Sequence, residues 1–256
     1  MFSPVTSVLI LQAGTPPDDV SSVVGDISTW FIDALGVSLA SLEIIPIYQG
    51  EPLPAPDASR VAIITGSWSM VTDKHPWSEA LAQWIRDAMA IEMPLFGVCY
   101  GHQLMAHALG GTVDYHPGGC EIGLQEIHLT AASRNDPLLQ DWPKRFSAHL
   151  THLQTITHLP AGAQVLGFSE HDPHQIVRYG VNAISTQFHP EFSPEIAAAC
   201  IRRRAASLES EGKDPTALLA VLGETPEAKR LLLRFIERSD PLNLIEFQQE
   251  KTHVIA

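Results

Sequence analysis

Short apolar runs alternate with helix-like segments over the first hundred residues, and this alternation is the feature that most restricts the fold. The apolar runs cover residues 7–14, 42–49, 60–67 and 93–98. Between them, residues 15–36 carry acids near the start and a terminal glycine, and residues 75–90 repeat large apolar side chains at helical spacing behind a proline. Continuous apolar strands that alternate with helices predict an α/β fold with a mostly parallel sheet covered on both faces. Sites in such sheets lie at the carboxyl ends of the strands.

The chain changes character after residue 111. Short strand-like runs at residues 121–130, 164–171, 175–180 and 182–191 are separated by turns, which predicts an antiparallel or mixed extension of the sheet. From about Ser193 the pattern is helical, and residues 228–239 are strongly amphipathic. Residues 251–256 form a tail with no visible role. No repeat, low-complexity tract or linker interrupts the chain, so we expect one domain over residues 1–256.

Composition excludes several classes of partner. A net charge of −13 argues against a nucleic acid or an anionic membrane as the main partner. Arg202–Arg204 form the basic cluster, which we expect to be a solvated helix face. The N-terminus lacks a basic segment before its apolar run, and no apolar stretch approaches the roughly 20 residues that span a bilayer. Three cysteines cannot form a disulfide framework, which favours a reducing cytoplasm.

Cys99 lies between two glycines, Gly97 and Gly101, where an apolar strand meets a predicted helix. This is the context of a nucleophile elbow, a strained turn that exposes a reactive atom at the edge of a sheet. Glycines are needed on both sides because side chains there would clash with the neighbouring strand and helix. The helix N-terminus next to the sulfur stabilises a thiolate. The alternative is a buried, unreactive cysteine.

A second motif, at residues 185–192, reads STQFHPEF. In an extended segment His189 and Glu191 point to the same side, and Pro190 helps to hold that extension. Glu191 can therefore hydrogen-bond one imidazole nitrogen and leave the other facing a thiol, which is the arrangement of a nucleophile, a base and an orienting carboxylate. The alternative is a surface His and Glu on a loop.

Together these motifs resemble the class I glutamine amidotransferases, and most of all their stand-alone GMP synthase-like members. The resemblance covers about residues 5–200, and it is carried by TGSWSMVTD, GVCYGHQLMAHALGG, EIGLQEIHLT, LPAGAQVLG and STQFHPEFS. It implies a flavodoxin-like open, mostly parallel twisted sheet with helices on both faces. The C-terminal helices at about residues 201–256 would then be an extension of this core.

The resemblance also implies roles for individual residues. Cys99 matches the nucleophile that forms a γ-glutamyl thioester, His189 matches the general base, and Glu191 matches the carboxylate that orients it. The backbone N–H groups of Gly66 and Tyr100 match the oxyanion hole, which holds the charge of the tetrahedral intermediate.

The remaining expected site residues line the substrate pocket: Ser67, which also shapes the oxyanion loop, Gln103, His152 and Gln154. One departure from the family concerns the last two. Relatives carry His-x-Asp before LPxGA, and the aspartate helps to hold the α-amino group of glutamine. Here His152 matches the histidine, and Gln154 stands in place of the aspartate. An amide accepts a hydrogen bond but lacks the charge that makes such bonds strong, which leaves the identity of the substrate open.

The leading hypothesis is therefore a Cys-His-Glu enzyme that releases ammonia from glutamine or a related γ-glutamyl amide. The first alternative is a γ-glutamyl peptidase with the same triad, and the second is a non-catalytic or partner-activated regulatory subunit. An amidotransferase would need a separate synthase chain to accept the ammonia.

No P-loop or dinucleotide fingerprint predicts a cofactor. The spacings of His149 with His152 and of His171 with His174 could place each pair on one helix face. No cysteine or carboxylate cluster completes a ligand set, so we expect no metal. We interpret Cys120 and Cys200 as structural or incidental.

Overall fold

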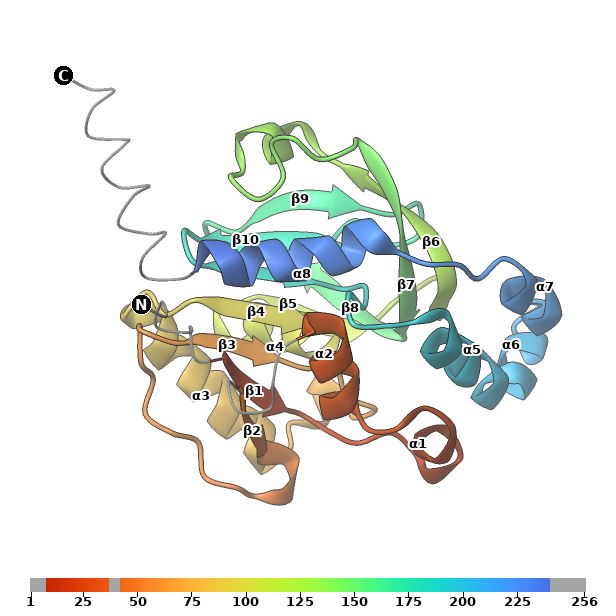
Figure 1. Ribbon diagram of the computed structural model, residues 1–256, viewed down its shortest axis with the longest axis horizontal. Helices are drawn as coiled ribbons and strands as arrows, with labels where there is room; N and C mark the ends of the chain where they lie inside the picture. Colours follow the sequence, from red (N-terminus) through yellow and green to blue (C-terminus); the bar gives the residue numbers. More distant parts are fainter. Residues whose placement is uncertain (1–7, 37–41, 240–256) are drawn as a thin grey trace.

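The computed structural model describes residues 8–36 and 42–239, so the predicted tail at residues 251–256 lies outside them. Within these residues a nine-stranded mixed sheet has the order β2-β1-β3-β4-β11-β10-β9-β6-β7 (Figure 1). Its strands are β1 (Val8–Gln12), β2 (Leu42–Pro46), β3 (Val61–Ile64), β4 (Leu95–Val98), β6 (Glu121–Leu129), β7 (Arg145–His152), β9 (Gln164–Phe168), β10 (Ile176–Gly180) and β11 (Ala183–Thr186). A separate two-stranded sheet pairs β5 (Thr112–Tyr115) with β8 (Gln154–His158).

Strands β2, β1, β3, β4 and β11 run parallel to one another. Every residue of β1, β3, β4 and β11 is buried, because helices cover both faces of this half of the sheet. The predicted parallel sheet is therefore confirmed. Its consequence for function is geometric: the loops that follow β3, β4 and β11 leave the same edge of the sheet side by side.

The helices are α1 (Asp18–Val24), α2 (Ile27–Leu35), α3 (Pro76–Ala90), α4 (Tyr100–Ala108), α5 (Pro194–Arg203), α6 (Ala205–Ser210), α7 (Pro215–Ala220) and α8 (Pro226–Arg238), with short 3-10 helices η2 (Ile47–Gln49), η3 (Val71–Asp73) and η4 (Ala131–Asn135). Two hydrophobic clusters lie on opposite faces of the sheet. One contains the buried side chains of α2, α5 and α8, and the other contains those of α3 and α4.

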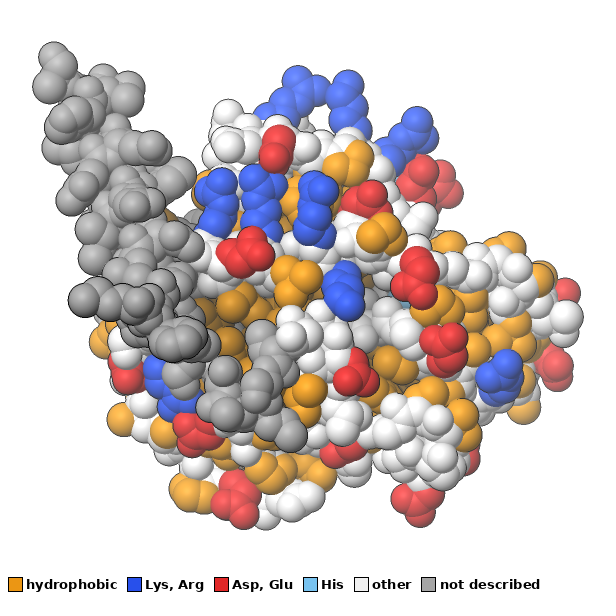
Figure 2. Space-filling model, viewed as in Figure 1, with side chains coloured by type: hydrophobic (Ala, Val, Ile, Leu, Met, Phe, Trp, Pro, Cys, Tyr) orange, Lys and Arg blue, Asp and Glu red, His pale blue; other side chains and the backbone are white. Residues whose placement is uncertain are grey.

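Helix α8 confirms the amphipathic pattern at residues 228–239. Its apolar side chains Leu231, Leu232 and Phe235 are buried against the sheet. Its outer side carries charge: the guanidinium carbon of Arg230 lies 4.2 Å from the centroid of the Trp142 ring. Figure 2 shows basic and acidic side chains interspersed on this face.

Residues 15–36, which the sequence suggested as one helical segment, form two helices. The chain breaks at Gly25, whose φ of 77° ends α1, and Asp26 then caps α2 by accepting a hydrogen bond from the N–H of Ile27 at 2.8 Å. The break directs α2 toward the carboxyl edge of the sheet, where Ile27 and Trp30 line the pocket described below.

The second half of the sheet is antiparallel from β11 to β7, as the runs after residue 111 predicted. The sequence analysis missed β5, β7 and β8. Strand β7 does carry an alternating signal, in which Phe146, Ala148 and Leu150 are separated by polar residues, but only these three apolar residues contribute to it. The expectation that His149 and His152 could share a helix face is therefore wrong, since both lie on β7.

The two glycines beside Cys99 are required by close packing. A Cβ at Gly101 would lie 2.3 Å from the carbonyl oxygen of Ile64 in β3, and one at Gly97 would lie 2.6 Å from the sulfur of Met105 in α4. Both distances are far inside van der Waals contact. Helix α4 thus lies directly on β3 and β4 at the turn that carries Cys99.

We expect Gly101→Ala to lower the free energy of unfolding by about 1–3 kcal/mol, the usual cost of overpacking a core. The matched control is Gly223→Ala, where an added Cβ meets no atom within 4 Å, and a change of less than about 0.5 kcal/mol is expected there. Urea denaturation followed by tryptophan fluorescence measures both. Equal effects of the two substitutions would contradict the packing argument.

Candidate active site

Cys99 occupies a strained turn between β4 and α4. Its φ of 50° and ψ of −97° lie outside the regions that non-glycine residues favour, and its N–H donates to the carbonyl of Thr186 in β11 at 2.8 Å. Such strain persists where the surrounding structure enforces it and is concentrated at functional sites. The turn has the geometry of the predicted nucleophile elbow.

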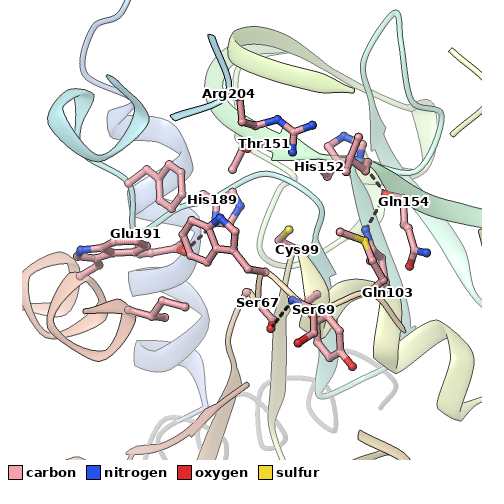
Figure 3. Close-up of a pocket in the computed structure, with 18 residues that line it drawn as sticks. Ser67, Ser69, Cys99, Gln103, Thr151, His152, Gln154, His189, Glu191 and Arg204 are labelled. Atoms are coloured by element: carbon pink, nitrogen blue, oxygen red, sulfur yellow. Dashed lines mark hydrogen bonds and ion pairs between the residues drawn. The ribbon is translucent and has the colours of Figure 1, made fainter. Parts of the chain in front are cut away.

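His189 and Glu191 follow β11 at the same edge of the sheet. The Nδ1 of His189 lies 2.7 Å from Oε1 of Glu191, and both side chains are buried. The imidazole stacks on the Phe192 ring with centroids 3.9 Å apart, and the backbone N–H of His189 donates to the carbonyl of His149 at 2.9 Å. The ring is thereby fixed, with its other nitrogen on the side of Cys99 (Figure 3).

The charge state of His189 follows from its neighbours. Burial by itself lowers the pKa of His189, but the negative charges of Glu191 and of a thiolate at Cys99, together with hydrogen bonds from the ring to both, raise that pKa to about 10. An imidazolium at neutral pH stabilises a thiolate on the adjacent sulfur. Burial raises the pKa of the Cys200 thiol to about 12 and raises the pKa of the Cys120 thiol as well.

Gly66 brings the loop after β3 against the same two side chains. A Cβ at Gly66 would lie 3.1 Å from Cε1 of His189 and 3.7 Å from Cβ of Cys99. Within the described residues, the N–H groups of Gly66 and Tyr100 donate no hydrogen bond. Two unengaged backbone donors beside the sulfur are what an oxyanion hole requires.

A single pocket contains all of the site residues expected from the sequence. It encloses about 610 Å³, including its open mouth. Its lining residues are Ile27, Trp30, Gly66, Ser67, Trp68, Ser69, Met70, Cys99, Tyr100, Gln103, Thr151, His152, Leu153, Gln154, His189, Glu191, Phe192 and Arg204. Figure 3 shows Cys99 near the centre, with Ser67 and Ser69 on one side and Thr151 and Arg204 on the other.

The amide of Gln154 is occupied within the protein. Its Oε1 accepts from the N–H of Val71 at 3.0 Å, and its Nε2 donates to Oγ1 of Thr72 at 2.6 Å. The amide thus ties β8 to η3. The backbone carbonyl of Gln154 accepts a hydrogen bond of 2.6 Å from Nε2 of Gln103, which orients that side chain beside the pocket.

Glu121 is a positioning residue that the sequence analysis missed. Its Oε2 lies 2.7 Å from Nε2 of His152, and it also accepts hydrogen bonds from Ser169 and Gln175. The Nδ1 of His152 faces the carbonyl of Gln154 at 2.9 Å. Both ring nitrogens of His152 thus face acceptor oxygens, which fixes the orientation of the ring. The signal in the sequence was slight, because the same strand carries a second acid, Glu126, which is exposed.

Among the described residues, one cluster could hold a metal ion: it contains Glu121, His152 and Asp172. Their potential ligand atoms all lie within 4.8 Å of one another. Both ring nitrogens of His152 already face acceptor oxygens of the protein, so a metal ion would have to displace one of these contacts. The donor set therefore fits a metal ion poorly, and its hydrogen bonds serve the pocket wall instead.

The arginine cluster is divided between two environments. Arg202 and Arg203 are exposed, as expected of a solvated helix face, and Arg203 pairs with Asp19. Arg204 lies at the end of α5, is half-buried and lines the pocket. The expectation of a solvated face is therefore wrong for Arg204, because the helix ends there and its last side chain turns inward.

Comparison with known proteins agrees with this geometry. The family model for class-I glutamine amidotransferases matches residues 32–205. A solved structure of a glutamine amidotransferase from Thermotoga maritima superposes with a TM-score of 0.73 at 23% identity, covering 93% of this chain and 100% of that one. The chain belongs to the class-I glutamine amidotransferase family.

Three relatives illustrate the range of the family. GMP synthase of Thermosipho africanus is 35% identical over 40% of this chain, but the match spans 19% of that protein. A protein of Schizosaccharomyces pombe described as glutamine amidotransferase-like is 27% identical over 76% of this chain and 83% of its own length. Gamma-glutamyl peptidase 5 of Arabidopsis thaliana is 23% identical over 68% and 70% respectively. The chain thus matches about a fifth of the synthase and most of the two shorter proteins.

Membrane insertion has no support in the described ranges. Among residues 8–36 and 42–239, no helix is both long enough and apolar enough to cross a bilayer.

The raised pKa of His189 predicts a pH-dependent contribution to stability. The folded-state pKa of about 10 exceeds the ordinary value of 6.5. Protonation of the ring therefore contributes stability that is complete below about pH 6.5 and is lost as the pH rises through about 10. We expect the difference in unfolding free energy between the wild type and His189→Gln to fall over this range, as measured by urea denaturation.

The matched control is His158→Gln, which replaces an exposed ring. Its difference from the wild type should stay flat over the same pH range. A difference for His189→Gln that is constant, or that grows with pH, would refute the imidazolium assignment.

Proposed function

We propose that the protein hydrolyses the γ-amide bond of glutamine or of a related γ-glutamyl compound through a thioester on Cys99. The observation that carries this proposal is the convergence of the strained Cys99 turn and the His189–Glu191 pair in one pocket. Two unengaged backbone N–H groups next to them supply what the tetrahedral intermediate needs.

The reaction follows from the roles of these groups. The Cys99 thiolate attacks the γ-carbonyl carbon, and the charge that develops on its oxygen is held by the N–H groups of Gly66 and Tyr100. The imidazolium of His189 gives its proton to the departing nitrogen, so that ammonia or an amine leaves and a γ-glutamyl thioester remains. His189 then takes a proton from water, which attacks the thioester. The tetrahedral intermediate then collapses, the sulfur leaves as the thiolate, and the γ-carboxyl group of the product loses its proton to solvent.

Glu191 keeps His189 in the required orientation throughout. Its carboxylate accepts a hydrogen bond from the Nδ1–H group and stabilises the positive ring in both half-reactions. Because Glu191 is buried and paired with the ring at 2.7 Å, its charge acts on His189 with little screening by solvent.

A γ-glutamyl peptidase activity is the second candidate, and a relative that carries this name supports it. Both polar atoms of the Gln154 amide are bound to η3, so the pocket lacks the aspartate with which relatives hold the α-amino group of glutamine. The family also includes a plant γ-glutamyl peptidase of similar length. The triad chemistry is unchanged, and only the leaving group differs.

Transfer of ammonia to an acceptor belongs to the same proposal. The chain spans about a fifth of the length of the GMP synthases that it matches, and a separate synthase chain is the proposed source of the acceptor site. A subunit active only with such a partner is the third candidate. The three cysteines are free thiols, which supports the cytoplasm as the location.

We expect Cys99→Ala to reduce glutamate release from L-glutamine or γ-glutamylglycine by at least about 10³-fold, because the thioester cannot form. The matched control is Cys200→Ala, which removes a buried thiol outside the pocket and should retain most of the activity. An enzyme-coupled glutamate assay measures both substrates. Hydrolysis that persists in Cys99→Ala would disprove the mechanism, and the preferred substrate decides between the first two candidates.

A further inference from the structure

Arg204 is a charged side chain of the pocket that has no ion-pair partner among the described residues. The other charged lining residues are compensated, because Glu191 pairs with His189 and His152 pairs with Glu121. The guanidinium group of Arg204 makes no ion pair or side-chain hydrogen bond, and its Nε is buried with no acceptor. A buried donor without a partner is costly.

The dipole of α5 does not explain why Arg204 lies in the pocket. Cations at a helix C-terminus are stabilised by the helix dipole, but Arg202 and Arg203 already occupy the last turn of α5 on its exposed side. Glu211, an acid within electrostatic reach of Arg204, forms its ion pair with Lys213 at 2.7 Å instead. Arg204 is therefore available to a ligand.

The direction of the side chain points to the substrate. Figure 3 shows the guanidinium group on the side of Thr151 and His152, extending toward the space above Cys99. A planar guanidinium binds a carboxylate through two parallel hydrogen bonds. In a chain of net charge −13, a cation left unpaired inside the pocket favours an anionic ligand over a neutral one.

We propose that Arg204 binds a carboxylate of the substrate and makes the pocket selective for carboxylate-bearing γ-glutamyl compounds. This inference rests on the proposed function and deepens it. Two carboxylates have the required chemistry: the α-carboxylate of the γ-glutamyl group, which glutamine carries, and the carboxylate of an amino acid in the leaving position, which a γ-glutamyl dipeptide carries in addition.

Ligand binding without turnover tests the proposal. In the Cys99→Ala protein, isothermal titration calorimetry with L-glutamine and with γ-glutamylglycine gives the two dissociation constants. Adding Arg204→Gln removes the charge, and Arg204→Lys keeps the charge but loses the paired hydrogen bonds. Adding Arg202→Gln, at an exposed position on the same helix, is the matched control.

We expect Arg204→Gln to weaken binding by about 10- to 100-fold, the usual worth of a hydrogen-bonded charge pair. Arg204→Lys should lie between this variant and its parent, and Arg202→Gln should match the parent. A loss for both ligands assigns Arg204 to the α-carboxylate, whereas a loss for γ-glutamylglycine alone assigns it to the leaving group. Should Arg204→Gln fail to fold, the Arg204→Lys protein supplies the comparison.

Two results would overturn the inference: equal affinities with and without Arg204, or no binding of either ligand to the Cys99→Ala protein. The proposed function fails independently, when wild-type protein shows no Cys99-dependent hydrolysis while the binding constants still respond to Arg204. The two failures are therefore distinguishable.

Discussion

The close approach of α4 to β3 is the constraint on which the site depends. With no side chain at Gly101, the helix lies against the carbonyl of Ile64, and the chain leaves β4 through a turn too sharp for ordinary backbone angles. Cys99 takes the strained position at this turn. Because β3, β4 and β11 are parallel neighbours, the same edge of the sheet receives the loop of Gly66 and the segment of His189. The packing of α4 against the sheet thus maintains the strained backbone at Cys99.

The backbone places the site residues, and their charged partners then determine what each histidine can do. The pocket wall contains two buried carboxylate–imidazole pairs with different purposes. In the pair of His189 and Glu191, one ring nitrogen remains directed toward the sulfur, so the ring can exchange a proton with the reacting groups. In the pair of His152 and Glu121, both ring nitrogens face acceptors, so this ring braces the carbonyl that orients Gln103. The two histidines thus have different roles, because the second ring nitrogen of each has a different neighbour.

Local sequence patterns predicted most of the fold and the core of the site. The apolar runs predicted the parallel strands, and the spacing of His189 and Glu191 predicted a pair that does form. The remaining features depend on contacts between residues that are far apart in the sequence. The amide of Gln154 is engaged by η3, more than eighty residues earlier, and Glu121 becomes visible as a positioning residue only when β6 and β7 pair. The break at Gly25 and the inward turn of Arg204 depend on where helices end, which periodicity determines poorly.

The central claim is that Cys99 is the activated thiol, and covalent labelling tests it most directly. A glutamine-like diazo-ketone alkylates a thiolate that sits in a glutamine pocket, and peptide mass spectrometry locates the adduct. The account predicts a single adduct per chain, on the peptide that contains Cys99, which excess glutamine suppresses. An unlabelled protein, or label spread over Cys120 and Cys200, would contradict it.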